Sequence, residues 1–316
     1  MASDKSSSCV KIEKVAFYNQ PDCYMISNGL VEVIVTTNIG PRVIGYRFCG
    51  GENIFAELPS TTAVTTEYGT WHACGGHRLW HAPEVKPRSY MPDNDAVKFE
   101  IIDNDTIRLM TAVEAATGIE KEMLVKLDSR SSKVTVTHKL TNRGLWSVEL
   151  APWALTIVRG GGEAIIPNEQ YISHDDVVLP ARPLALWHFT DLSDSRWTFG
   201  CKYIRLRSDS ALENPQKIGV GVKQGWAGFI HGETFFLKKF PYVDGANYPD
   251  YGSNCEIYTE GSFMEVETLG PLATVEPEQS VIHIEDWFLF DGVRKGKTDS
   301  DLDAAIMPLV ESANCG

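Results

Sequence analysis

Hydrophobic and polar residues alternate with a period of two along most of this chain. The alternation is clean over residues 133–140, and residues 98–102 and 106–110 alternate on either side of a short polar turn. This pattern is typical of half-buried β-strands, in which successive side chains face opposite sides of a sheet. About fifteen segments qualify as strands, the others being residues 10–17, 23–27, 30–36, 42–48, 119–127, 147–157, 203–207, 218–224, 227–231, 234–239, 255–259, 263–269 and 280–290.

Helical periodicity is convincing in one place only. Residues 299–310 begin with an acidic cluster and continue as a helically spaced apolar stripe, in which Pro308 predicts an irregular last turn. Two long stretches, residues 58–95 and 168–197, lack a regular pattern and are expected to be functional loops. We therefore expect an all-β fold, a single large antiparallel β-sandwich (supersandwich) domain over residues 1–316 with one short C-terminal helix.

Composition and charge narrow the classes of partner. Hydrophobic residues make up 43% of the 316 residues, which is ordinary for a globular protein, and 42 acidic against 29 basic residues give a net charge of −13. An acidic surface repels nucleic-acid phosphates and anionic membranes, and no apolar stretch is long enough to span a bilayer. We expect a small-molecule ligand and neither a nucleic-acid nor a membrane partner, while the oligomeric state is left open.

Cysteines and motifs are informative mainly by what they exclude. The seven cysteines are scattered without a Cys-x-x-Cys pair, and residues 1–8 lack the apolar core of a secretory signal, so we expect a cytoplasmic protein without a disulfide framework. The chain has no nucleophile elbow, zinc-protease motif, dinucleotide fingerprint or P-loop. No cofactor is expected.

The segment 71–84 is the first candidate for chemistry. It contains three of the chain's eight histidines: His72, His77 and His81. Trp80 offers a flat face on which a sugar ring can stack, and Arg78 carries forked donors for hydroxyls or a carboxylate. The histidine spacing is not a known zinc signature, so a polar binding loop is favoured, with a metal site or a purely structural role as alternatives.

Two carboxylates form the second candidate. In a strand over residues 263–269, Glu265 and Glu267 point to the same face, and Glu256 lies on the neighbouring strand. If that face lines a cavity, burial and mutual repulsion raise the pKa of at least one carboxyl, as suits a general base. The alternative is a solvated strand face.

Two further residues are candidates for the same cleft. Pro152 within a strand predicts an edge or a bulge, which could aim Trp153 into a cleft, although a core tryptophan is an equal alternative. A solvated Lys239 is the favoured interpretation, and the alternative is that Lys239 enters a polar cavity, in which case Lys238 faces outward. His283 is expected to be structural.

Taken together, these segments resemble the galactose mutarotase-like (aldose 1-epimerase-like) superfamily, in an uncharacterised branch. Residues 38–44 look like the family's turn into its second strand pair, Gly76-His77-Arg78 follows a long loop, and residues 263–268 are similar to the strand that ends in the family's catalytic glutamate. The resemblance follows the order of elements over nearly the whole chain.

The resemblance implies an isomerase of the aldose 1-epimerase type acting on a sugar or sugar-like ring. Glu267 then corresponds to the base that takes the anomeric proton, and His77 is the candidate acid that protonates the ring oxygen. Arg42 and Arg78 would hold hydroxyls or an acidic group, with Trp80, His81, Trp153, Glu265 and Lys239 also placed around the substrate.

One departure from the family leaves the reaction open. The family has a histidine in its middle strand region, where residues 151–155 of this chain have none, so the acid must come from His77, His81, His174 or Lys239. Two alternatives therefore remain. The first is a lyase or cyclase working in the same cleft, and the second is a non-catalytic carbohydrate-binding protein.

Overall fold

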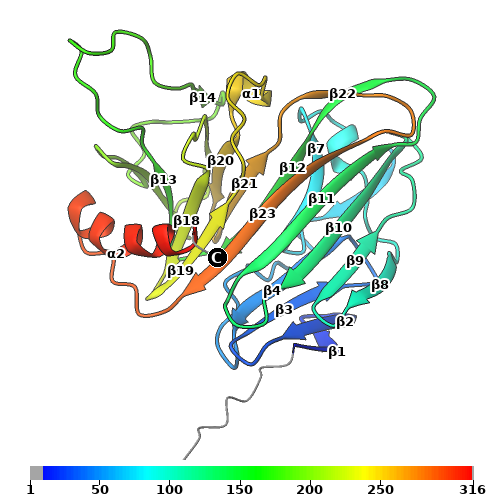
Figure 1. Ribbon diagram of the computed structural model, residues 1–316. Helices are drawn as coiled ribbons and strands as arrows, with labels where there is room; N and C mark the ends of the chain where they lie inside the picture. The colour runs from blue at the N-terminus through cyan, green and yellow to red at the C-terminus, as the bar shows by residue number, and fades with distance from the viewer. Residues whose placement is uncertain (1–9, 315–316) are drawn as a thin grey trace, which may run out of the picture.

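A computed structural model describes residues 10–314 as two large antiparallel sheets stacked face to face (Figure 1). The expectations for residues 1–8, Cys9 and Cys315 lie outside the described residues. Strand makes up about 48% of the chain and helix 7%, which confirms the all-β sandwich class. No helix of the described residues has both the length and the apolar character to cross a membrane.

The first sheet has ten strands in a row and an eleventh that pairs with β12. In spatial order the ten are β1 (Lys11–Phe17), β2 (Gln20–Ser27), β3 (Val31–Thr36), β4 (Arg42–Phe48), β7 (Gly76–Ala82), β12 (Val148–Arg159), β21 (Phe263–Leu269), β20 (Cys255–Glu260), β17 (Gln216–Val220) and β14 (Leu184–Leu186) within residues 10–314. The eleventh is β22 (Ala273–Val275).

The second sheet has ten strands in the described part of the chain. Their order is β15 (Trp197–Phe199), β16 (Tyr203–Arg207), β13 (Glu163–Pro167), β18 (Trp226–His231), β19 (Thr234–Lys239), β23 (Ser280–Phe290), β11 (Val134–Asn142), β10 (Ile119–Leu127), β9 (Thr106–Met110) and β8 (Lys98–Asp103). The remaining elements are the hairpin β5 (Ala63–Thr66) and β6 (Gly69–His72), the 3-10 turn η1 (Arg88–Tyr90), the short kinked α1 (Pro249–Gly252) and the helix α2 (Asp299–Ser312).

The predicted C-terminal helix is confirmed as α2. Thr298 caps it by accepting a hydrogen bond from the backbone N–H of Asp301, whose side chain bonds back to the cap residue. The helix continues through Pro308 to Ser312, so the expected irregular end is wrong. Its apolar stripe packs on the outer face of the second sheet, beside β18 and β19 (Figure 1).

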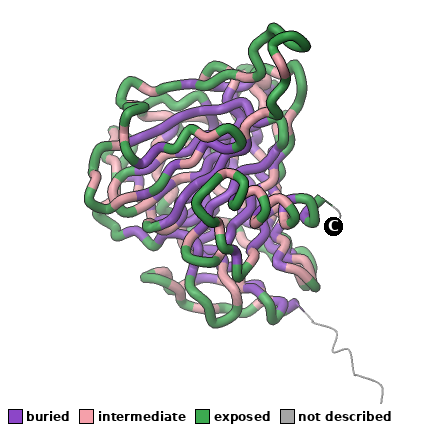
Figure 2. Tube along the Cα trace, turned by 90° about the vertical axis from the view of Figure 1, so that its left-hand side faces the viewer, coloured by how far each residue is buried: buried purple, intermediate pink, exposed green. Residues whose placement is uncertain are grey.

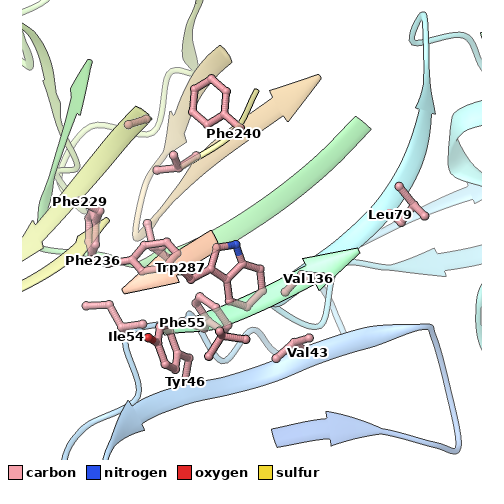
Figure 3. Packing of buried hydrophobic residues seen from close by; sticks show 14 of the residues in the cluster. Val43, Tyr46, Ile54, Phe55, Leu79, Val136, Phe229, Phe236, Phe240 and Trp287 are labelled. Carbon is pink, nitrogen blue, oxygen red and sulfur yellow. The ribbon is translucent and has the colours of Figure 1, made fainter. Parts of the chain in front are cut away.

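The main core fills the space between the two sheets. Trp287 of β23 lies with its ring centroid 5.6 Å from that of Phe55 and 6.1 Å from those of Tyr46 and Phe236 (Figure 3). Figure 2 shows the buried strands running through the middle of the molecule, with exposed residues concentrated in the connecting loops. Hydrophobic burial between the sheets therefore holds the sandwich together.

Two sequence predictions about strands need correction. Residues 58–95 were expected to be a loop, yet they supply β5, β6 and the fully buried central strand β7, which lacks alternation because both of its faces are covered. Pro152 lies in a central strand and not at an edge. It sits where the partner of β12 changes from β22 to β21, a junction at which its missing N–H does little harm.

A matched pair of leucines tests this description of the core. Leu140 is fully buried in β11 and Leu145, five residues later, is 85% exposed. Leu140→Ala should lower the free energy of unfolding by about 2–5 kcal/mol, whereas Leu145→Ala should change it by no more than about 0.5 kcal/mol. Urea unfolding of both variants checks this, and equal losses would contradict the assigned core.

Candidate functional site

A cavity of about 410 Å³ opens on the outer face of the first sheet, the face that points away from the second sheet. Its floor is formed by β7, β12, β21, β20 and β17, and its walls by the segments around residues 62–90 and 187–189. The lining is rich in aromatic side chains, and eight of them are Trp71, Trp80, Tyr90, Trp153, Trp187, Phe189, Tyr258 and Phe263. The size and lining are those of a small-molecule site.

One ion pair crosses the floor of this cavity. Arg78 on β7 places Nη2 3.2 Å from Oε1 of Glu265 on β21. The Arg78 guanidinium carbon also lies 5.0 Å and 4.7 Å from the ring centroids of Trp71 and Trp80. Arg78 is only 3% exposed, and its Nε and Nη1 have no hydrogen-bond partner within residues 10–314. A bound ligand can satisfy these donors.

A second charged cluster lies deeper, around Lys217 on β17. Its Nζ is 3.0 Å from Oε2 of Glu267 and 2.7 Å from Oε2 of Glu256. Trp153 Nε1 donates a 2.8 Å hydrogen bond to the same Oε2 of Glu267. Lys217 Nζ also lies 5.0 Å from the ring centroid of Trp153 and 4.7 Å from that of Trp187. The ammonium is thus held between two carboxylates and two indole rings.

Burial and neighbouring charges decide the protonation states. Burial raises the pKa of Glu265 above its ordinary value, and Arg78 only partly opposes this effect. Burial disfavours the Lys217 ammonium, but Glu256 and Glu267 outweigh it and hold the pKa of Lys217 above its ordinary value. The cavity therefore contains a charged lysine and a carboxyl group whose pKa lies above its ordinary value.

Four predicted site residues meet in this cavity: Arg78, Trp80, Trp153 and Glu265. Glu267 lies on the same strand face beneath them, with no exposed surface, and contacts Lys217 and Trp153. Sequence reasoning placed the two carboxylates on one face, as observed. It placed Glu267 in contact with substrate, whereas Glu265 is the carboxylate that lines the cavity.

His77 does not reach the cavity, contrary to the sequence expectation. Because side chains alternate along β7, His77 points into the space between the sheets while Arg78 points outward. His77 Nε2 lies 2.6 Å from His138 Nε2, and its Nδ1 lies 2.8 Å from Thr156 Oγ1. Its side chain is fully buried. The candidate acid must therefore be another group.

A buried polar cluster surrounds His77 between the sheets. Glu285 accepts a 2.8 Å hydrogen bond from Trp287 Nε1 and lies 2.9 Å from Lys238 Nζ. Ligand atoms of His77, His138 and Glu285 lie within 4.8 Å of one another, which is a possible metal-ligand grouping. The ammonium of Lys238 already neutralises Glu285, so these residues are complete as an ion pair with neutral histidines.

Lys238 and Lys239 have the opposite orientations to those predicted. Lys238 is fully buried between the sheets, where it donates hydrogen bonds to the backbone carbonyls of Val266 and Ala154 at 3.0 Å and 3.4 Å. Lys239 faces the C-terminal helix and bonds to Asn314. The prediction failed because α2 covers the outer face of β19. Apolar residues therefore occupy both faces of this strand, and the sequence pattern does not show which lysine points inward.

The other candidates also lie away from the cavity. Arg42 is fully buried and donates two hydrogen bonds of 2.8 Å to the carboxylate of Asp93, so it holds the loop that carries Asp93 in place. His81 faces the inner side of the sheet and lines a separate cavity of about 290 Å³, and His72 Nδ1 lies 2.9 Å from the backbone oxygen of Ser60. His72 on β6 and His77 and His81 on β7 therefore point to three different places and do not form a shared metal site.

Lys217 is a charged residue of the cavity lining that sequence reasoning missed. Lys217 is one lysine in a short strand, and nothing local to residues 216–220 distinguishes it from a solvated lysine. Its role depends on the cross-strand partner Tyr258 and on the neighbouring carboxylates, which come from residues about 40–50 positions later. The stretch 168–197, predicted to be a functional loop, contains the short strand β14 and places Trp187 at the wall of the cavity.

Comparison with known proteins supports the fold. No sequence-family model matches this chain, and no protein of curated function matches it. Many solved structures share its architecture. A galactose mutarotase-like protein from Lactobacillus casei superposes with a TM-score of 0.56 at 9% identity, covering 85% of this chain and 100% of that one.

Two further structures are similar. A Salmonella typhimurium protein, provisionally named a mutarotase, gives a TM-score of 0.56 at 10% identity, covering 91% of this chain and 95% of that one. A TPR-domain-containing protein from Parabacteroides distasonis gives 0.58 at 13% identity, and this chain spans 47% of its length. The predicted resemblance to the galactose mutarotase-like fold is thus confirmed as a likeness of fold.

The buried histidines provide a test of the inter-sheet cluster. Burial lowers the pKa of His283 to about 3, because the charged imidazolium loses its hydration. Between about pH 6.5 and pH 3 the unfolded chain therefore binds more protons at this position than the folded one, and stability should fall as the pH falls. NMR titration should show a neutral His283 ring at about pH 5.

The same chain unfolded in urea serves as the control, since its histidines should titrate near their ordinary pKa of about 6.5. A His283 ring that becomes charged above about pH 6 in the folded protein would contradict the buried neutral network.

Proposed function

We propose that the cavity binds a sugar or sugar-like ring and interconverts its anomers by proton transfer, as an aldose 1-epimerase-type isomerase. The observation that carries the proposal is the Arg78–Glu265 pair on the floor of an aromatic-lined cavity, within a galactose mutarotase-like fold. Ring opening requires a base at the anomeric hydroxyl and a proton donor at the ring oxygen. A carboxyl group with a raised pKa and a cationic donor both line this cavity.

The roles follow from what can touch a ligand. Glu265 lines the cavity and takes the anomeric proton, the role that the sequence resemblance gave to Glu267. Glu267 contributes as the buried anion that fixes Lys217 and Trp153. Arg78 donates to substrate hydroxyls through its unpaired N–H groups, and the two cations stabilise negative charge that develops on the ring oxygen.

The charge of the site suits a neutral, hydroxyl-rich ligand. Arg78 is paired with Glu265, and Lys217 with Glu267, so the deep charges of the cavity are balanced within the protein. The hydroxyl groups of a sugar can accept hydrogen bonds from Arg78 and donate hydrogen bonds to Glu265, while the indole faces of Trp80 and Trp153 contact the sugar ring. As the sequence predicts, we place this chemistry in the cytosol. The five described cysteines are unpaired, which is typical of a reducing compartment.

The many aromatic side chains that line the cavity favour a second candidate function. Eight aromatic side chains among the described residues line the cavity, more than one free sugar ring can cover. A lyase or cyclase acting on a cyclic substrate with an apolar substituent would use the same carboxylate and the same cations. A non-catalytic carbohydrate-binding role needs neither the raised pKa nor the buried lysine.

Exchange of anomers tests the proposal directly. Saturation-transfer and exchange NMR on a panel of hexoses, uronic acids and sugar phosphates should show exchange accelerated by the wild-type protein. Glu265→Gln should slow that exchange by about 10²–10⁴-fold, since it removes the base but keeps the shape. Glu233→Gln, an exposed residue in a surface turn, should leave the rate unchanged.

The outcomes separate the candidates. A loss confined to Glu267→Gln, with Glu265→Gln active, would restore the original assignment of the base. Binding without exchange in the wild type would indicate a carbohydrate-binding protein. If no member of the panel binds, the substrate is not a common sugar, and the lyase or cyclase candidate is favoured.

A further inference from the structure

Three carboxyl groups and two cations lie at or beneath the floor of the cavity, and their charges balance only if one of the carboxyl groups is neutral. Glu256 and Glu267 are direct cross-strand neighbours on β20 and β21, so their side chains stand on the same face of the sheet. Glu265 is paired with Arg78, which leaves Lys217 as the one cation paired with Glu256 and Glu267 in the described part of the chain. If all three carboxyls were ionised, the buried cluster would carry an uncompensated negative charge, which is costly.

The hydrogen bonds show which carboxyl is the neutral one. Glu267 accepts from Trp153 Nε1 and Lys217 Nζ, and both donors stabilise its anion. Glu256 has only the ammonium of Lys217 near it among the described residues, 2.7 Å from Oε2, and its Oε1 has no partner. With one donor group against two for Glu267, Glu256 is the less stable of the two as an anion.

Among residues 10–314, Lys217 is the only cation that forms an ion pair with Glu256. Glu256 has no exposed surface. The charged groups that act on it from the packed elements are Lys217 on β17, Glu267 on β21 and Asp250 on α1. Burial is the largest effect and raises the pKa of Glu256 well above its ordinary value, and Glu267 and Asp250 act in the same direction against Lys217.

We propose that Glu256 holds a proton at neutral pH and is the acid of this cavity, delivering that proton to the substrate ring oxygen through Lys217. Delivery rests on the proposed function, whereas the stored proton does not. Lys217 lines the cavity and contacts Glu256 at 2.7 Å, so one residue touches both the substrate and the proton store. This supplies the acid that the missing strand histidine leaves unassigned.

The proton transfer balances without a further reactant. Glu265 accepts the anomeric O–H proton, the carbonyl forms, and the bond between the anomeric carbon and the ring oxygen breaks. The ring oxygen takes a proton from the Lys217 ammonium as Lys217 takes the proton of the Glu256 carboxyl, so that Lys217 keeps its charge and Glu256 becomes the anion. Reclosure on the other face reverses each transfer, so the protein ends as it began.

Infrared spectroscopy of the full-length protein tests the stored proton without any substrate. The wild type at about pH 7 should show the carbonyl band of a protonated carboxyl group, shifted in deuterated water, where an ordinary glutamate with a pKa of about 4.3 gives none. Glu256→Gln should abolish the band, and Glu233→Gln, which is solvent-exposed, should keep it. A band unchanged in Glu256→Gln, or no band in the wild type, would overturn the inference.

The urea unfolding midpoints of two variants test the same inference independently of the infrared band, in case a substitution alters folding. Glutamine resembles a protonated glutamate, so Glu256→Gln should leave the urea midpoint at about pH 7 unchanged. Glu267→Gln removes an ionised partner of Lys217 and should lower that midpoint. The reverse order would show that Glu256 is the ionised member and would overturn the inference.

Activity separates this inference from the proposed function. With a turned-over sugar in hand, Glu256→Gln should slow exchange by about 10²-fold or more with KM little changed, and should alter the limb of the pH profile that reports the acid. A band lost in Glu256→Gln with no sugar turned over refutes the isomerase and keeps the proton store. Full exchange by Glu256→Gln refutes the delivery role and leaves the isomerase standing.

Discussion

Alternation of side chains along three central strands decides what each face of the first sheet can do. On β7, β12 and β21, odd and even positions go to opposite faces, so Arg78 and Glu265 enter the cavity while His77 and Thr268 enter the interior. The same strands therefore serve two polar clusters with different solvent exposure. A shift of register by one residue would exchange them, and so burial on both sides fixes the register.

The interior cluster supports the cavity from behind. Lys238, on the second sheet, bonds to the backbone carbonyls of Ala154 and Val266, which are neighbours of cavity residues on β12 and β21. Thr268 bonds to His283 and Glu285 across the sandwich, directly after Glu267 in the chain. These contacts tie the second sheet to the strands that carry the carboxylates. Such satisfied buried networks favour one arrangement over alternatives, because each broken partner leaves a buried polar group unpaired.

Sequence reasoning recovered the fold class because period-two alternation survives wherever one face of a strand is exposed. It missed β7, because both faces of that strand are buried and its polar and apolar residues do not alternate. It found the strand 234–239 but not the direction of Lys238, because both faces of β19 are buried as well. It placed Glu265 and Glu267 on one face from parity alone. It could not find Lys217, since that assignment depends on which strands become neighbours, and pairing across some 50 residues leaves no local trace.

The aromatic walls of the cavity act on the cations as well as on a ligand. Arg78 lies against the rings of Trp71 and Trp80, and Lys217 against those of Trp153 and Trp187. Cation–π contacts hold these charged groups in place and exclude water from them. Donors fixed in this way need little reorganisation when charge develops on a substrate oxygen, and in a site of low dielectric their effect is larger than in water. The abundance of tryptophan in this cavity is therefore explained in part by the positioning of its charges.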